Sequence, residues 1–156
     1  MSAAVVIAHL CAREEVVVNV ELALLADYAA VMKDDKLMAA GVFDQLRPLD
    51  MPWRHPTMFI ALRVHFHPGE DGSHEIKIRL VDPDGKEIVS LEAKAGVLKV
   101  DPLEGANLQL VLSLNNVPFE VYGRHAFDVF LDGRYEYTIP LVVAKRPEPA
   151  DTVGEG

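Results

Sequence analysis

The stretch Ile60-Ala61-Leu62-Arg63-Val64-His65-Phe66-His67 decides the fold class, because large apolar side chains occupy every second position. A period of two is typical of a β-strand with one buried face and one face in water. The same alternation recurs in residues 76–80 and in residues 127–131. The chain is therefore expected to be built from strands that each bury one face.

Turn-forming residues separate these runs at fairly regular spacing. Asp132-Gly133 lies between two apolar runs, and this dipeptide readily adopts the positive φ angles that a type I′ hairpin turn needs. In Asp82-Pro83-Asp84-Gly85, proline presets the φ angle of a turn that glycine closes. We expect eight strands, near residues 19–32, 36–47, 57–67, 74–82, 86–97, 106–118, 124–132 and 134–145.

An open sheet of eight such strands would leave its apolar faces in water. Two antiparallel sheets packed face to face bury them, so the sequence predicts an all-β, two-sheet β-sandwich, immunoglobulin-like or related. Residues 19–145 form this domain. Residues 1–18 are expected to be an N-terminal extension or arm, and residues 146–156 a disordered acidic tail rich in proline and glycine.

Composition excludes several classes of function. The chain has 156 residues, of which 50% are hydrophobic and 25% charged, as in an ordinary single globular domain. Its net charge of −9 disfavours binding to nucleic acid or to an anionic membrane. Cys11 is the only cysteine, which excludes an internal disulfide. With neither a basic leader nor an apolar run of about 18 residues, the protein is expected in the cytoplasm.

The pair His65-x-His67 is a candidate metal site, because side chains two apart in a strand point the same way. Across a hairpin with the next strand, Glu75 could supply a third ligand. The simpler interpretation is a polar row on a solvent-facing sheet surface.

Asp27 and Asp44 are a candidate carboxylate pair. If the first hairpin turns at Asp34-Asp35, Asp27 faces Val42 and lies diagonal to Asp44, at about 7 to 8 Å between Cα atoms. That separation resembles the acid and base of a glycosidase. The alternative is that each carboxylate accepts hydrogen bonds at a strand end. Because the sequence has no phosphate loop, nucleophile elbow or zinc-protease motif, we expect no enzymatic activity and no cofactor.

Two further segments could bind a ligand or partner. Residues 47–56 form a connection that is too long and too rich in proline for a hairpin, so it should cross between the sheets. In this connection Trp53, with Arg54 and His55, is either an interface anchor or a cover for one end of the sandwich. Asn115 and Asn116 interrupt an apolar strand, which indicates a bulge or a crossing to the other sheet or, alternatively, a ligand contact.

Several short motifs follow one another in a familiar order. They are Leu22 to Ala29, Gly41-Val42-Phe43-Asp44, His55-Pro56, Arg79 to Lys86 and Leu114-Asn115-Asn116. Together they resemble a bacterial domain-of-unknown-function family of small, single-domain β proteins, over residues 19–144. The resemblance implies a β-sandwich in a bacterial cytoplasm and supplies no activity, cofactor or catalytic residue.

The first two expected strands carry apolar residues on both faces, among them Leu25, Met38 and Val42. A lone sandwich would keep one of these faces polar. We therefore expect a non-enzymatic binding or assembly module that self-associates or docks a protein partner. Residues 1–18 could cover the face, or pair with an edge strand of a second chain. The alternative is a small-molecule or metal-binding protein that uses Asp27 and Asp44, or His65 and His67.

Overall fold

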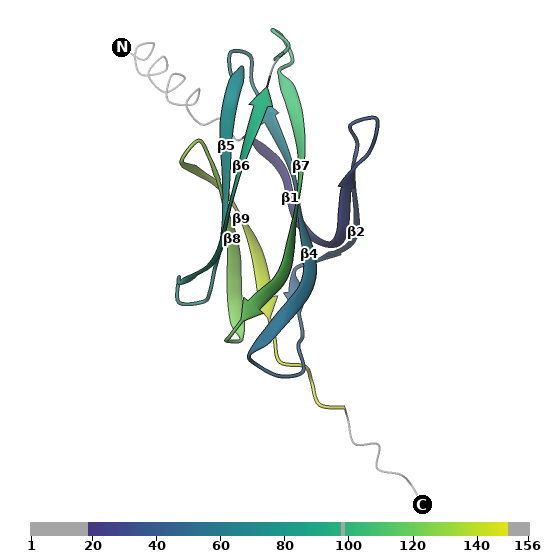
Figure 1. The fold of residues 1–156 in the computed structure, drawn as a ribbon, viewed down its shortest axis with the longest axis vertical. Coiled ribbons are helices and arrows are strands. Elements are labelled where there is room, and N and C mark those ends of the chain that lie inside the picture. The colour runs from purple at the N-terminus through teal and green to yellow at the C-terminus, as the bar shows by residue number, and fades with distance from the viewer. Residues whose placement is uncertain (1–18, 98, 150–156) are drawn as a thin grey trace, which may run out of the picture.

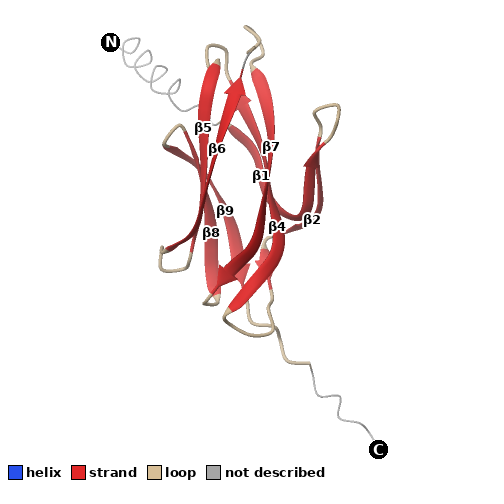
Figure 2. Ribbon diagram, in the orientation of Figure 1, coloured by secondary structure: helices blue, strands red, loops and turns tan. Residues whose placement is uncertain are grey.

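The computed structural model describes residues 19–97 and 99–149, and within them the chain forms nine strands and no helix (Figures 1 and 2). The expected arm, residues 1–18, and residues 150–156 of the expected tail lie outside the described part. The strands are β1 (Val20–Val31), β2 (Leu37–Phe43), β3 (Gln45–Leu46), β4 (Trp53–Phe66), β5 (Gly72–Val81), β6 (Glu87–Val97), β7 (Ala106–Phe119), β8 (Gly123–Leu131) and β9 (Arg134–Val143).

The strands form two sheets that pack face to face, as Figure 1 shows. Sheet A has the order β2-β1-β4-β7, and sheet B has the order β3-β9-β8-β5-β6. Neighbouring strands are antiparallel, with the exception of the short pair β3 and β9, which is parallel. The predicted two-sheet β-sandwich is confirmed.

The core lies between the sheets and follows the alternation seen in the sequence. In β4 the side chains that point inward are at most 1% exposed: Met58, Ile60, Leu62, Val64 and Phe66. Sheet B contributes to the same core Ile76, Ile78 and Leu80 from β5 and Phe127, Val129 and Leu131 from β8. Leu25 of β1 is also buried in this core, so the apolar excess of the first hairpin lies on its other face.

The predicted turns are confirmed. Asp132 and Gly133 have φ angles of 49° and 80°, as a type I′ turn requires. The Gly85 N–H donates to the Asp82 carbonyl at 3.0 Å and closes the second turn. The expected bulge at Asn115-Asn116 is wrong, because the β4–β7 register runs without a shift from Thr57 opposite Asn115 to His55 opposite Val117. Asn116 instead has a φ of 53°, and Leu114 and Val117 on either side of it are both buried.

One predicted strand is wrong. Residues 36–47 do not form a single strand, because the chain passes from sheet A to sheet B at Asp44. Beyond that point the Asp44 carbonyl accepts a hydrogen bond from the N–H of Val142 at 2.8 Å, and β3 pairs with β9. Residues 47–52 then cross back to sheet A, as expected of this segment, and β4 begins at Trp53, earlier than predicted.

Candidate functional site

The outer face of sheet A, which points away from sheet B, is largely apolar. The pairing of its strands brings Leu24 beside Ala61, Ala26 between Val42 and Phe59, and Tyr28 beside Ala40. The Tyr28 ring packs edge-on against Phe59 at 5.4 Å between centroids. We call this surface the apolar outer face; its members are Leu22, Leu24, Ala26, Tyr28 and Ala30 of β1, Met38, Ala40 and Val42 of β2, Phe59 and Ala61 of β4, and Val111 of β7.

The exposure of these side chains increases toward β2. Ala26 and Ala61, near the middle of the sheet, are fully covered by their neighbours. Tyr28 is 49% exposed and Val42, on the edge strand, is 61% exposed. The part of the face that contacts water most therefore lies along β2.

The edge strands of the two sheets differ in charge. In sheet B the edge strand β6 carries Glu87, Glu92 and Lys94, and the other edge, β3, has only two residues. Charges and short length are the usual protection of an edge against pairing with another chain. In sheet A neither edge strand, β2 (LMAAGVF) or β7 (ANLQLVLSLNNVPF), contains a charged residue. Sheet A is thus the sheet whose edges are open to a partner.

Polar residues border the apolar outer face where β1, β4 and β7 meet. Arg63 Nε donates to Glu21 Oε2 at 2.8 Å, and His65 Nδ1 lies 2.8 Å from Asn107 Oδ1. At the other end of the same strands, Thr57 Oγ1 donates to Asn115 Oδ1 at 3.0 Å. Asn115 therefore belongs to a polar rim in which its side-chain oxygen already has a partner.

The predicted carboxylate pair is wrong in its register. The β1–β2 register places Asp27 opposite Gly41 and not Val42. The Asp27 carboxylate lies over that glycine, since a Cβ at Gly41 would come within 2.5 Å of Asp27 Oδ2. Asp44 lies beyond the end of β2, at the passage between the sheets. The two carboxylates do not share the sheet position that an acid and base pair would need.

The residues around Trp53 are part of strand β4 and not of a loop. The indole of Trp53 stacks on Phe119 at 5.9 Å, so it covers one end of the core. His55 packs edge-on against Trp53 at 5.1 Å, and burial lowers the pKa of its imidazole. Arg54 Nη1 donates to the carbonyl of Asn116 at 3.2 Å and thereby holds the residue of β7 whose φ is positive.

The predicted metal site does not form. The rings of His65 and His67 do lie together, at 4.7 Å between centroids. Glu75, however, is in β5, which belongs to sheet B, because β4 and β5 do not pair as a hairpin. Within residues 19–97 and 99–149 no group of three metal-ligating side chains comes together.

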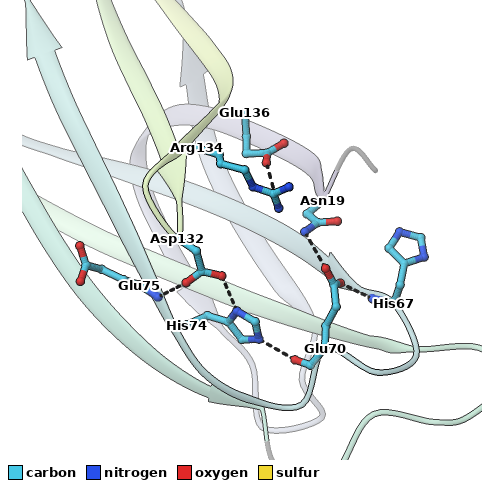
Figure 3. Close-up of polar contacts among 8 residues, drawn as sticks. All are labelled: Asn19, His67, Glu70, His74, Glu75, Asp132, Arg134 and Glu136. Atoms are coloured by element: carbon cyan, nitrogen blue, oxygen red, sulfur yellow. Dashed lines mark hydrogen bonds and ion pairs between the residues drawn. The ribbon is translucent and has the colours of Figure 1, made fainter. Parts of the chain in front are cut away.

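A polar cluster that the sequence did not reveal joins the β4–β5 loop to the β8–β9 turn (Figure 3). His74 Nδ1 lies 2.6 Å from Asp132 Oδ2, and His74 Nε2 lies 2.5 Å from the Glu70 carbonyl oxygen. Burial opposes protonation of His74, but these hydrogen bonds outweigh it and raise its pKa above 6.5. Asp132 also accepts from the N–H of Glu75 at 2.9 Å, and its pKa is lowered by these contacts in spite of burial.

Glu70 completes the cluster by binding the start of the sandwich domain. Its Oε2 accepts from the N–H of His67 at 2.6 Å, and its Oε1 lies 3.5 Å from Asn19 Nδ2. Figure 3 shows the His67 ring pointing away from His74. The cluster joins the β4–β5 loop to the β8–β9 turn and to the residue before β1, so it holds this end of the sandwich together.

At the opposite end of β8, a cavity of about 230 Å³ lies between the turns that follow β5 and β7. Its lining includes buried His125, whose Nδ1–H donates to the Gly123 carbonyl at 3.2 Å, and the carboxylates of Asp82, Glu87 and Glu120. None of the eight lining residues carries a hydroxyl or thiol group that could act as a nucleophile.

A comparison with protein families identifies the sandwich. The model of DUF6941, a family of unknown function, matches residues 21–144, which is nearly the whole of β1 through β9. The chain belongs to DUF6941. This confirms the resemblance that the sequence motifs indicated, and membership in DUF6941 supplies no activity.

Other comparisons add little to DUF6941 membership. No curated protein matches the sequence. Among solved structures, the crystal structure of an immunoglobulin-like protein from Pseudomonas aeruginosa matches with 14% sequence identity and a TM-score of 0.34, over 77% of this chain and 91% of that chain. The described residues contain no helix that is long and apolar enough to cross a membrane.

Proposed function

We propose that the chain is a non-enzymatic assembly module that binds a second copy of itself through sheet A, in the bacterial cytoplasm. The observation that carries this proposal is the apolar outer face, which extends to an edge strand without charge. The chain has a net charge of −9, so two copies repel each other over most of their surface. An almost neutral sheet is where contact costs least.

A second copy also suits the kind of surface that sheet A offers. Large apolar patches on soluble proteins mark sites of interaction, and interfaces between identical subunits are more apolar than other surfaces. Leu22, Tyr28 and Val42 are each at least 40% exposed on this one face. Val42, on the edge strand, is the side chain expected to lose most of its contact with water when two copies associate.

The mass of the protein in solution, measured by light scattering, tests the proposal. The intact chain should have twice its mass of 17.2 kDa. Val42→Glu places a charge on the most exposed apolar side chain of the face and should give a monomer. Leu103→Glu is the control, because Leu103 is 90% exposed in the turn before β7. A monomeric intact chain, or a Val42→Glu variant with unchanged mass, would refute the proposal.

The same measurement on a chain that begins at Asn19 tests the N-terminal arm. We expect this shortened chain to remain a dimer, with twice its own mass, because sheet A is complete without residues 1–18. A fall to the mass of a monomer would assign the association to the arm instead.

A further inference from the structure

Strand β2 has a free edge whose hydrogen-bonding groups can be identified. The Met32 N–H donates to the Lys36 carbonyl at 2.7 Å, and the register then runs without a shift from Val31 opposite Leu37 to Leu25 opposite Phe43. In an antiparallel ladder the groups of successive residues point alternately toward and away from the neighbour. The groups that point away from β1 therefore belong to Leu37, Ala39 and Phe43, whereas Gly41, with a φ of 69°, departs from the regular ladder.

Nothing in the described part of the chain uses these groups. In sheet A, β2 pairs with β1 only, and Figure 1 shows it at the outer edge of the sandwich. An uncharged edge strand with unpaired groups is a ready template for a strand from another chain.

We propose that β2 pairs antiparallel with β2 of a second copy, about a two-fold axis at Ala40. This inference rests on the proposed function and specifies its geometry. The register places Leu37 opposite Phe43 of the copy, so that the free groups of both residues pair, and it places Ala39 opposite Gly41. The small Ala40 faces itself at the axis.

Side chains support the same register. On the outer face, Met38 comes opposite Val42 of the second copy, so the two exposed apolar residues of β2 become cross-strand neighbours. The two four-stranded sheets then continue into one sheet of eight strands. The pairing gives Met38 and Val42 neighbours along the edge of β2, whereas the apolar side chains of β1 stay on the outer face of the joined sheet.

Charge at the ends of β2 selects this register. Residues whose numbers sum to 80 face each other within β2, so the register brings Lys36, directly before β2, near Asp44, directly after β2 of the other copy. Among residues 19–97 and 99–149, the one ion pair of the Lys36 ammonium is with the neighbouring Asp34, at 2.8 Å, and this pair is exposed. Moving the axis by one residue, to position 39, would place Lys36 opposite Val42 and leave the complementary charges apart. Opposite charges directly across strands stabilise pairing, and like charges oppose it.

Charge reversal in the full-length chain tests the register. Lys36→Glu and Asp44→Lys each create two like-charge pairs in the dimer and should weaken dimerisation by about tenfold, measured as the dissociation constant from light scattering over a dilution series. The double variant restores opposite charges and should recover the original constant. Lys94→Glu on the edge of sheet B is the control, because it changes the net charge as Lys36→Glu does.

A cysteine at the axis gives an independent measurement. Directly opposed residues of a non-hydrogen-bonded antiparallel pair have Cα atoms about 4.5 Å apart, within disulfide range. Ala40→Cys in a Cys11→Ser chain should therefore cross-link two copies under oxidised glutathione, whereas Leu103→Cys in the same chain should not.

The outcomes separate the two proposals. In one outcome, Val42→Glu dissociates the dimer, but Lys36→Glu and Asp44→Lys change the dissociation constant no more than Lys94→Glu does. This result overturns the β2 register and keeps the assembly function. A double variant as weak as the single variants also overturns the register. An intact chain that is monomeric at every concentration overturns both proposals.

Discussion

Replacing Gly41 by alanine should destabilise the protein for two reasons that can be measured separately. Gly41 has a φ of 69°, which costs an alanine about 1 kcal/mol relative to glycine. In addition, the new Cβ would lie 2.5 Å from Asp27 Oδ2 and 2.9 Å from Asp27 Cγ, so the carboxylate must move. We expect the free energy of unfolding to fall by about 2 kcal/mol in total.

Urea denaturation of a double-mutant cycle separates the two contributions. In an Asp27→Gly background both the carboxylate and the Cβ of Asp27, which would lie 3.0 Å from the new Cβ, are absent, and Gly41→Ala should then cost only the backbone penalty, about 1 kcal/mol. All four proteins are compared at one protein concentration, because association also stabilises the folded chain. An equal loss in both backgrounds would refute the role of the Asp27 contact, and no loss in either would refute the backbone constraint at position 41.

Three further predictions follow from the core, the polar cluster and the histidine pair. Phe66→Ala, at a position that is fully buried, should reduce the free energy of unfolding by about 3 to 5 kcal/mol in urea denaturation. The pKa of His74 is raised, so its contribution to stability is fully present below the unfolded value of 6.5 and is lost as the pH rises through the folded pKa. The difference in free energy of unfolding between the wild type and His74→Gln should therefore be larger at about pH 5.5 than at about pH 8.5. A difference that does not depend on pH would contradict this. Zinc or nickel should leave the Tm unchanged, since Glu75 lies in the other sheet from His65, and a rise in Tm that His65→Ala abolishes would show that the pair binds metal after all.

The alternation of side chains was sufficient to predict the two-sheet sandwich, because burial of one face determines which residues of a strand point inward. It was not sufficient to predict the register of the first hairpin. A two-residue turn at Asp34-Asp35 would place Asp27 opposite Val42. The chain instead uses a three-residue turn, in which Asp35 has a φ of 60°, and this single extra residue moves Asp27 to face Gly41.

The candidate metal site failed for a different reason. Residues 67–71 have the length and composition of a hairpin loop, yet they connect β4 of sheet A to β5 of sheet B. The local sequence is compatible both with a hairpin within one sheet and with a connection between the sheets, and packing of the whole domain decides between them. The contact of His74 with Asp132 could not be predicted from the sequence either, because the two residues are 58 positions apart and no periodicity links them.

The order of strands in sheet A has a consequence for synthesis on the ribosome. The strand β7, which completes this sheet, is made only after β5 and β6 of the other sheet. Until residue 119 has left the exit tunnel, one side of β4 has no neighbour and the nascent chain exposes backbone groups beside an apolar surface. Late closure by a distant strand is slow and favours wrong association of unfinished chains. Conditions that slow translation between β4 and β7 should therefore lower the yield of folded protein more than the same delay after β7.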